Sequence, residues 1–592
     1  MSKRVSKVGW IIMAALLCVS LAILPACGGG GAIPYKNPGV FVQQTIGRID
    51  SLDPCYCYDT ASGEQIYYMY EGLLGYNGTS TDTFVGLMAT DYYWVNSTSL
   101  RFNIRPGVRF SNGDNMTVAD VEYSFERAMV EDPDYGPVWM FYFPLLDTYG
   151  SRNSTGNITI TSAEIDHAVE VVNSTCIEFN FVRPFPATTW YQIVCGSWGS
   201  IVDKAYCVAH GDWPGSWGNW TLYNNPAQTN LVLQSRAMGT GPWALDTWTP
   251  PGEIKLVKND YYWNAGVHAV PFDRVLTQFV DSWPSRKLAL LAGDCDIAYC
   301  PRTNIADLAG VADVNAVSGL PELTIDSFYF NQNITSTTTY AGSKTLDGNG
   351  ISLDFFSDIN VRKGFTYAFD WATYIAQAMQ GEATQRGSPF VYGLPYFNPA
   401  ANMYSKNLTL AKYYLEHSAW GNLTAIGFKF TLIYNTGNLV RKTACEILAN
   451  NLFAISPNFQ VAVLAKDWSS TMSLIRGRTW VMFQIGWLPD YADPDNYAVP
   501  YMHSQGTFSG PASFNNATVD ALIAEGAIST NTTRRQEIYY ALQQAWYDQL
   551  PGIILAQPLG RRFFTKYISG FEFNPTTCGQ PGNLYYMSKS ES

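Results

Sequence analysis

The residues best suited to bind a ligand lie together in one short segment, residues 484–497, which reads QIGWLPDYADPDNY. A strand-like apolar run leads into it, and Pro489 and Pro494 predict a rigid loop, where binding residues concentrate. The loop presents Trp487, Asp490 and Tyr491. An aromatic plate beside a carboxylate is a good receptor for a small amphipathic ligand that carries a cation. An ordinary proline-aspartate turn with a buried tryptophan is the alternative.

Catalytic motifs are absent from the sequence. The chain has no G-x-S-x-G turn, P-loop, H-E-x-x-H helix or C-x-x-C pair. Asp490, Asp493 and Asp495 share one loop, so by themselves they do not supply the opposed carboxylates of a glycosidase. The five histidines show no metal-ligand spacing. The sequence therefore predicts a binding protein, with no enzyme activity, cofactor or metal.

The N-terminus predicts export. Residues 1–26 combine a basic start, an apolar run shorter than a membrane span and small residues directly before Cys27. This pattern resembles a bacterial lipobox, so we expect a mature chain that is anchored to the membrane by a lipid on the Cys27 thiol. Residues 27–36 form a flexible tether. A plain signal peptide and an uncleaved anchor are the alternatives, and all three place the globular part outside the cytoplasm.

Charge and composition exclude one large class of partner. The net charge is −12 at pH 7, and removing the signal, which holds three basic residues and no acid, leaves about −15. Nucleic acid needs a basic surface and is therefore not expected. Aromatic residues make up 15% of the chain, which suits partly wet binding clefts. A mature chain of roughly 560 residues is too long for one core and predicts two or three domains.

The cysteines and asparagines indicate an oxidising, exported environment. Nine cysteines remain beyond the signal and Cys27. The spacing favours local disulfides between Cys195 and Cys207 and between Cys295 and Cys300, although sequence does not fix connectivity. Twelve Asn-x-Ser/Thr sequons indicate N-glycosylation, with chance in an Asn-rich, Ser/Thr-rich chain as the alternative.

Strand-like and helix-like segments alternate along the chain, which favours α/β layers. Apolar residues spaced three and four apart predict helices, and alternating or continuous apolar runs predict strands. One expected helix begins at Thr117 in capping-box style. The other expected helices cover 361–380, 439–453 and 533–549. The expected strands cover 100–104, 428–434, 461–464 and 481–485.

Short motifs along residues 50–560 resemble the family 5 extracellular solute-binding proteins of ABC importers, the oligopeptide, dipeptide and nickel class. The most specific match runs from RFNIRPGVRFSNGD at 101–114 into ADVEYSF at 119–125. The others are SLDP at 51–54, YEGLLGY at 70–76, GTGPW at 239–243, NDYYW at 259–263, AGDCDI at 292–297, VRKGFTYAFD at 361–370 and the loop at 484–497. Each match is modest alone, but their order is specific.

The resemblance implies an α/β, two-lobed periplasmic-binding-protein fold of the cluster C type. Lobe I would comprise residues 37–76, 226–322 and 551–592, with a subdomain at 77–225 inserted in it. Lobe II would span 323–550, and segments 323–331 and 551–557 would form the hinge. A peptide or other small ligand would be engulfed between the lobes and delivered to ABC permease subunits by a monomer. A ligand-presenting sensor of the same fold is an alternative role.

The resemblance also assigns residues to the ligand. Asp490 matches the aspartate that pairs with a peptide α-ammonium, Trp487 the indole of the first side-chain pocket, and Tyr491 lies beside them. Asp493 is expected to bond the amides of its own loop in an Asx-type turn. The opposite lobe would contribute Tyr56, Tyr58 and Tyr191, with core packing as the alternative for each. Arg476 and Arg478 are candidates for the ligand carboxylate. Oligosaccharide and nickel-chelate binding are the alternative ligand classes.

Overall fold

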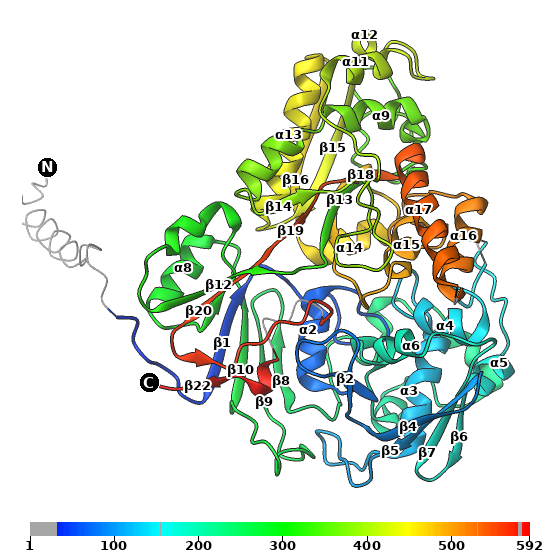
Figure 1. The fold of residues 1–592 in the computed structure, drawn as a ribbon, viewed down its shortest axis with the longest axis vertical. Coiled ribbons are helices and arrows are strands. Elements are labelled where there is room, and N and C mark those ends of the chain that lie inside the picture. The colour runs from blue at the N-terminus through cyan, green and yellow to red at the C-terminus, as the bar shows by residue number, and fades with distance from the viewer. Residues whose placement is uncertain (1–31, 154, 530, 578–582, 592) are drawn as a thin grey trace, which may run out of the picture.

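The computed structural model describes residues 32–153, 155–529, 531–577 and 583–591 (Figure 1). The predicted signal peptide, Cys27 and the start of the tether lie outside these ranges. None of the helices within them is long and apolar enough to cross a membrane. The fold is α/β and two-lobed, as predicted, with a five-stranded sheet in the upper part of Figure 1 and a seven-stranded and a four-stranded sheet below it.

A seven-stranded sheet of order β12-β20-β11-β1-β10-β9-β8 forms the core of one lobe. Its strands are β1 Val40–Thr45, β8 Trp243–Thr249, β9 Glu253–Lys258, β10 Arg274–Phe279, β11 Ile297–Ala298, β12 Val314–Leu320 and β20 Gly560–Thr565. Three distant parts of the chain thus share one sheet. β1 runs parallel to its neighbours β10 and β11, so their carboxyl ends lie at one edge.

A four-stranded antiparallel sheet of order β4-β5-β7-β6 lies beside this lobe. Its strands are β4 Ala89–Asn96, β5 Ser99–Ile104, β6 Val169–Asn173 and β7 Cys176–Asn180. β5 alternates half-buried and buried residues, as its sequence predicts. Two small pairs complete the lower part: β2 Leu74–Tyr76 with β3 Phe84–Gly86, and β21 Ile568–Ser569 with β22 Ser588–Lys589.

The helices of this lower part include α3, whose capping box between Thr117 and Asp120 confirms the predicted start. The helices are α2 Thr60–Met69, α3 Val118–Glu131, α4 Trp139–Leu146, α5 Ser162–Ala168, α6 Ala187–Val194, α7 Lys204–Ala209 and α8 Trp283–Leu291.

The second lobe is built on a five-stranded sheet of order β16-β15-β17-β13-β18. Its strands are β13 Ile325–Phe330, β15 Phe428–Asn435, β16 Phe459–Lys466, β17 Met482–Trp487 and β18 Gly552–Ile554, with β14 Ala383–Gln385 and β19 Ala556–Pro558 paired separately. The three predicted strands of this region are confirmed. β13 is buried on both faces because helices cover both sides of the sheet.

Helices α9, α11 and α13 pack with one face of this sheet, while Tyr329 on the other face packs with Tyr501 of α15 and Trp546 of α17. The helices are α9 Ile359–Ala368, α10 Trp371–Thr373, α11 Leu408–Glu416, α12 Leu423–Ile426, α13 Leu439–Ile455, α14 Trp468–Arg476, α15 Asp495–Met502, α16 Ala517–Ile528 and α17 Thr532–Gln549. The predictions at 439–453 and 533–549 are confirmed.

Two sequence predictions need correction. The helix expected over 361–380 ends at Ala368, because Asp370 caps a new short helix by accepting from the Thr373 amide. The two expected local disulfides are absent: Cys195, Cys207, Cys295 and Cys300 carry free thiols. Short spacing in sequence does not bring two Cβ atoms into disulfide geometry.

The chain passes between the two large sheets twice. It leaves β12 for β13 through residues 321–324, and it returns from β18 through β19 to β20. The two crossings lie side by side, because the Gln557 side chain donates to the Glu322 carbonyl over 3.0 Å. The predicted hinge segments, 323–331 and 551–557, overlap these crossings but also include β13 and β18 of the second lobe's sheet. The hinge and the domain limits stay predictions.

Candidate ligand-binding site

Both large sheets direct the carboxyl ends of parallel strands toward a common cleft. β15 runs parallel to β16 and to β17. Residues at or just beyond their ends, Asn435, Trp468 and Trp487, line cavities in the cleft. Thr45 at the end of β1 and Ala298 at the end of β11 line it from the other lobe. Ligands of open α/β sheets bind beyond these strand ends, so the fold itself marks the cleft as the site.

The first cavity is aromatic and has a volume of about 290 Å³. Tyr58 of one lobe and Trp487 of the other meet edge to face, with ring centroids 5.4 Å apart. Trp198 packs against Tyr58 in the same way at 6.1 Å. The remaining aromatic and aliphatic lining consists of Tyr135, Trp468, Met472, Ile475, Ile485, Leu488, Phe508 and Phe573. These walls suit an apolar or aromatic side chain of a ligand.

Asp490 is one of three acidic residues that line this cavity, with Asp59 and Glu322, and only 5% of its surface is exposed. Its Oδ2 accepts hydrogen bonds from the Tyr58 hydroxyl at 2.7 Å and from the Asn496 side-chain amide at 2.8 Å. Burial raises the pKa of Asp490 to about 7, although both hydrogen bonds favour the charged form and oppose the rise. Among the described residues no cation forms an ion pair with it. The cavity therefore holds a carboxyl group whose charge can be neutralised by a proton or by a cationic ligand, but by no cation among the described residues.

Asn496 fixes the loop that carries Asp490. Its Oδ1 accepts from the Asp490 backbone amide at 2.7 Å and from the Trp487 indole at 3.2 Å, so one side chain orients both residues. Asp493 accepts from the Asp495 amide at 3.2 Å, as the predicted Asx-type turn requires, and it pairs with Arg535 at 2.9 Å. Asp493 thus holds the loop, which leaves Asp490 facing the cavity.

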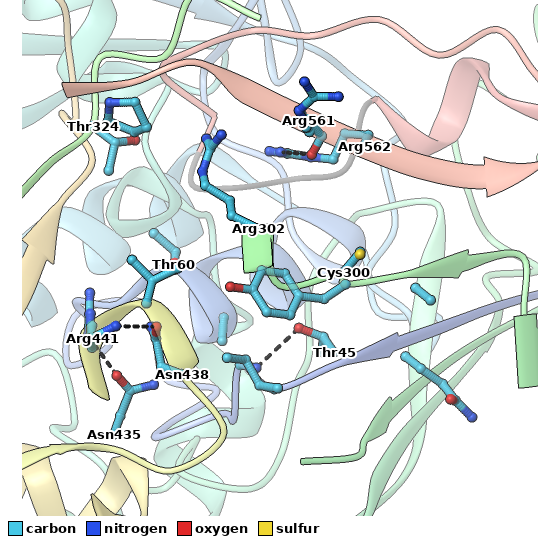
Figure 2. Close-up of a pocket in the computed structure, with 18 of the residues that line it drawn as sticks. Thr45, Thr60, Cys300, Arg302, Thr324, Asn435, Asn438, Arg441, Arg561 and Arg562 are labelled. Carbon is cyan, nitrogen blue, oxygen red and sulfur yellow. Dashed lines mark hydrogen bonds between the residues drawn. The ribbon is translucent and has the colours of Figure 1, made fainter. Parts of the chain in front are cut away.

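A second, polar cavity of about 420 Å³ adjoins the first. The two share the lining residues Asp59, Thr60, Glu322, Thr324, Arg441, Trp468 and Arg562. Figure 2 shows Arg302, Arg561 and Arg562 on one side of it, and Arg441 beside Asn435 and Asn438 on another. Arg48 also lines this cavity.

These arginines already have carboxylate partners. Arg441 lies 3.4 Å from Asp326, and Arg562 lies 3.4 Å from Glu322. The other pairs are Arg48 with Asp281, and Arg302 and Arg561 with Glu382. Positive charge in the polar cavity is therefore largely balanced before a ligand arrives.

Two further acids face the cleft without an ion pair among the described residues. Asp59, the N-cap of α2, lines both cavities, and burial together with nearby Asp50 raises its pKa to about 6. Burial raises the pKa of Glu64 to about 7, opposed by hydrogen bonds from Gln43 and Tyr68. The cleft consequently favours a ligand that brings positive charge.

The structure brings together Trp487, Asp490 and Tyr58, three of the six predicted ligand-binding residues. Tyr491 points away and donates to Asp495 at 2.9 Å. Tyr191 lies in the four-stranded-sheet region, where its hydroxyl accepts from Trp94 at 3.1 Å. Neither residue lines the aromatic cavity or the larger cavity that adjoins it.

The third tyrosine, Tyr56, sits behind the cavity wall and contacts Arg476, whose guanidinium lies 4.4 Å from the ring centroid. Arg476 itself lines the aromatic cavity and reaches Asp50 at 3.2 Å. Arg478 instead donates to Ser513 and lines neither cavity. Of the two predicted carboxylate partners, only Arg476 is therefore at the site.

Sequence reasoning missed the residues of the polar cavity, above all Arg441 and Glu322. A signal for Arg441 was present: it lies one turn into a helix that begins directly beyond the predicted strand 428–434. Parallel strands place such helix starts at the ligand edge of the sheet. Glu322 had no signal, because pairings between distant segments place it: β12 before it pairs with β20, and β13 after it pairs with β17.

Away from the cleft, a buried cluster carries several charges. Asp53, Cys55 and Glu131 bring potential metal-binding atoms within 4.8 Å of one another. The Arg127 guanidinium occupies the same space, at 2.6 Å from Asp53, 3.1 Å from Glu131 and 2.7 Å from Asp212. An arginine among three acids makes this cluster an internal ion-pair network.

Comparisons with known proteins agree with the geometry. The family model for bacterial extracellular solute-binding proteins, family 5, matches residues 83–509. The oligopeptide-binding protein OppA of Bacillus subtilis is 22% identical, covering 92% of this chain and 93% of its own. The heme-binding protein A of Haemophilus influenzae is 23% identical, covering 87% and 86%.

Solved structures share the fold. A peptide complex of DppA from Helicobacter pylori has a TM-score of 0.74 at 18% identity, covering 94% of this chain and 98% of its own. An oligopeptide transporter substrate-binding domain from Bacillus anthracis has a TM-score of 0.75 at 15% identity, covering 94% and 100%. The chain therefore belongs to the bacterial extracellular solute-binding proteins of family 5, which are transport components and not enzymes.

Proposed function

We propose that this protein is the lipid-anchored peptide-binding component of an ABC importer, and that Asp490 pairs with the α-ammonium group of the peptide. One observation carries the proposal: a buried carboxyl group with no cationic partner among the described residues lies in a cavity between two lobes. A bound ammonium would supply the missing charge in a water-excluded site, where such a pair gains most.

The surroundings of Asp490 support a peptide as the ligand. Trp487, Tyr58 and Trp198 form an apolar wall for the first side chain. The adjoining polar cavity is wide enough for the rest of a short chain, and Arg441 faces both cavities from the second lobe. Several relatives are named for oligopeptides or dipeptides, which supports the same class.

A lipid anchor would keep the protein close to the permease to which it delivers its ligand. The proposed lipid on Cys27 and the tether at 27–36 lead into β1, which lies in the seven-stranded sheet. The ligand would be released when the two lobes part about the crossings near Glu322 and Gln557. The protein would act as a monomer outside the cytoplasm.

The decisive experiment is calorimetric titration of the full mature chain with matched peptides. Asp490→Asn should weaken binding of a free-amine peptide by about 30-fold or more, because truncating a buried charge pair costs about 2–5 kcal/mol. The N-acetylated peptide, which has no ammonium, should bind wild type and variant with similar weak affinity. Equal losses for both peptides would remove Asp490 from the assigned role.

A thermal-shift screen with peptides, oligosaccharides and nickel chelates tests the ligand class first, since a ligand that binds the native state raises its melting temperature. We expect shifts with peptides. Shifts with sugars alone, together with a greater loss for Trp487→Ala than for Asp490→Asn, would establish stacking on sugar rings instead. A response to nickel chelates alone would refute the peptide class as well.

A further inference from the structure

The twelve sequons of the chain share a feature that chance does not predict. All twelve have threonine at the third position and none has serine, although the two residues are almost equally common in the chain. Their asparagines are Asn77, Asn96, Asn115, Asn153, Asn157, Asn173, Asn219, Asn333, Asn407, Asn422, Asn516 and Asn531. A selection for the Asn-x-Thr triplet itself explains this bias.

The structure places these asparagines on the surface. Asn516 is half-buried and the other eleven are exposed. The fully buried asparagines, Asn259, Asn331 and Asn496, all lie outside sequons. The whole set is therefore accessible to an enzyme that acts on the folded or folding chain.

The side-chain nitrogen, to which a glycan would be attached, is also available. Within the described ranges only Asn157 and Asn516 among the sequon residues donate a hydrogen bond through Nδ2. Asparagines outside sequons commonly use this atom in packing: Asn112, Asn180, Asn224, Asn225, Asn259, Asn304, Asn331, Asn360, Asn402, Asn451, Asn458, Asn496 and Asn574.

Helix capping does not require the threonines. Four sequon asparagines, Asn407, Asn422, Asn516 and Asn531, are helix N-caps, but a cap needs only a side-chain oxygen and no hydroxyl two residues later.

In the hairpin turns the asparagine and the threonine cooperate. Asn96 Oδ1 accepts from the Thr98 amide at 2.7 Å and from its hydroxyl at 3.1 Å. Asn173 and Thr175 repeat this arrangement at 2.9 and 3.0 Å. The oxygen of each asparagine is held by the turn, while its Nδ2 donates no hydrogen bond within the described ranges and the residue is exposed.

None of the asparagines that line the two cavities of the cleft lies in a triplet that could accept a glycan. Asn435 and Asn438 line the polar cavity, and neither has serine or threonine at the third position. Asn574 lines the aromatic cavity in an Asn-x-Thr triplet, but its middle residue is Pro575, which prevents glycosylation. Residues 222–332 and 534–592, which supply six strands of the seven-stranded sheet, contain no sequon. Sugars would thus decorate the outer walls and leave the cleft and the tether side clear.

We propose that this protein is N-glycosylated at its exposed Asn-x-Thr sequons, by a membrane transferase that uses a lipid-phosphate-linked oligosaccharide. In the transfer, a bond forms between asparagine Nδ2 and C1 of the first sugar, and the bond from C1 to the phosphate oxygen breaks. The lipid phosphate leaves, a base of the transferase takes the Nδ2 proton, and no group is oxidised or reduced. The proposal rests on the export that is part of the proposed function, and not on the ligand.

The test uses the full chain purified from membranes of its own host. Mass spectrometry of its peptides should find sugar on Asn96 and Asn173. Asn349, which is equally exposed but lies outside a sequon, and Asn574 should carry none. A processed, membrane-anchored chain with bare Asn96 and Asn173 would overturn the proposal while leaving peptide binding and export intact. An unprocessed chain in the cytoplasm would overturn glycosylation and the proposed export together.

Matched variants separate modification from folding. Thr98→Ala removes the hydroxyl but keeps the turn bond from its backbone amide, so the mass should fall by one glycan. Thr98→Ser keeps an acceptor triplet and should retain that glycan. Masses of the two variants that differ only by the one oxygen atom of serine would refute modification at Asn96. Both variants should bind the peptide used for Asp490 as wild type does, which separates this test from that of the binding site.

Discussion

Replacing Asp490 by asparagine should stabilise the ligand-free protein even as it removes ligand binding. Burial raises the pKa of this carboxyl group from 3.8 to about 7. A shift of about three units corresponds to about 4 kcal/mol between its two protonation states. Below about pH 4 the group is protonated in both the folded and the unfolded chain and makes no difference. Between about pH 4 and pH 7 the unfolded chain loses the proton first, so the folded state is increasingly disfavoured, and above pH 7 the penalty is constant.

Asparagine at this position escapes the penalty and keeps the local bonds. Tyr58 and Asn496 both donate to the same oxygen, Oδ2, so an amide oxygen can replace it. The variant should therefore gain up to about 4 kcal/mol in unfolding free energy at pH 7 and nothing near pH 4. The value is an upper limit, because any opening of the lobes rehydrates the carboxylate.

Chemical denaturation of both proteins between pH 4 and pH 8 measures this difference. Asp260→Asn, a change at an exposed aspartate, serves as the matched control and should leave the pH profile unchanged. A gain that is independent of pH would show that packing and not charge is responsible. A loss of stability at pH 7 would refute the reasoning that Asp490 is an unneutralised buried acid.

Three further outcomes follow from the same geometry. The affinity for a free-amine peptide should rise by up to about tenfold per pH unit below pH 7 and then level off, because Asp490 must be ionised to pair with an ammonium; titration calorimetry with an N-acetylated control should show no such rise. Trp487→Ala should lower the unfolding free energy by about 3–5 kcal/mol and remove peptide binding, whereas Trp487→Phe should recover most of the stability in denaturant melts. Arg127→Met should cost about 3–5 kcal/mol in the same melts, since it strands three buried acids, and unchanged stability would contradict the ion-pair network.

The loop at residues 484–497 was predictable because residues that are neighbours in sequence determine its conformation. A strand that stops at two prolines fixes where Trp487 and Asp490 lie, and the Asx turn of Asp493 involves only its own loop. The strands and long helices of the second lobe were predictable for the same reason, since periodicity is a property of neighbouring residues. Local capping also explains the error in the helix over 361–380, because Asp370 overrides the apolar stripe.

The rest of the cleft depends on pairings between distant segments. Glu322 reaches it through strand register, and Trp198 reaches it through a short 3-10 turn that packs on Tyr58. Tyr191 has the residue type of a pocket wall, but its hydroxyl is taken by Trp94. Residue type and motif position cannot show whether a residue lines the cleft, because the residues that it contacts lie far away in sequence.

The position of Asp490 also links ligand binding to lobe closure. One of its hydrogen bonds comes from Asn496 in its own lobe, and the other comes from Tyr58 across the cleft. In the hinge motion that we propose, closure buries this carboxylate and therefore costs up to about 4 kcal/mol at neutral pH when no cation is present. A bound ammonium removes that cost, which corresponds to a shift of about a thousandfold in the ratio of closed to open forms. The arginines of the polar cavity, already paired with carboxylates, add no comparable penalty. One unneutralised acid thus suffices to make closure depend on a cationic ligand.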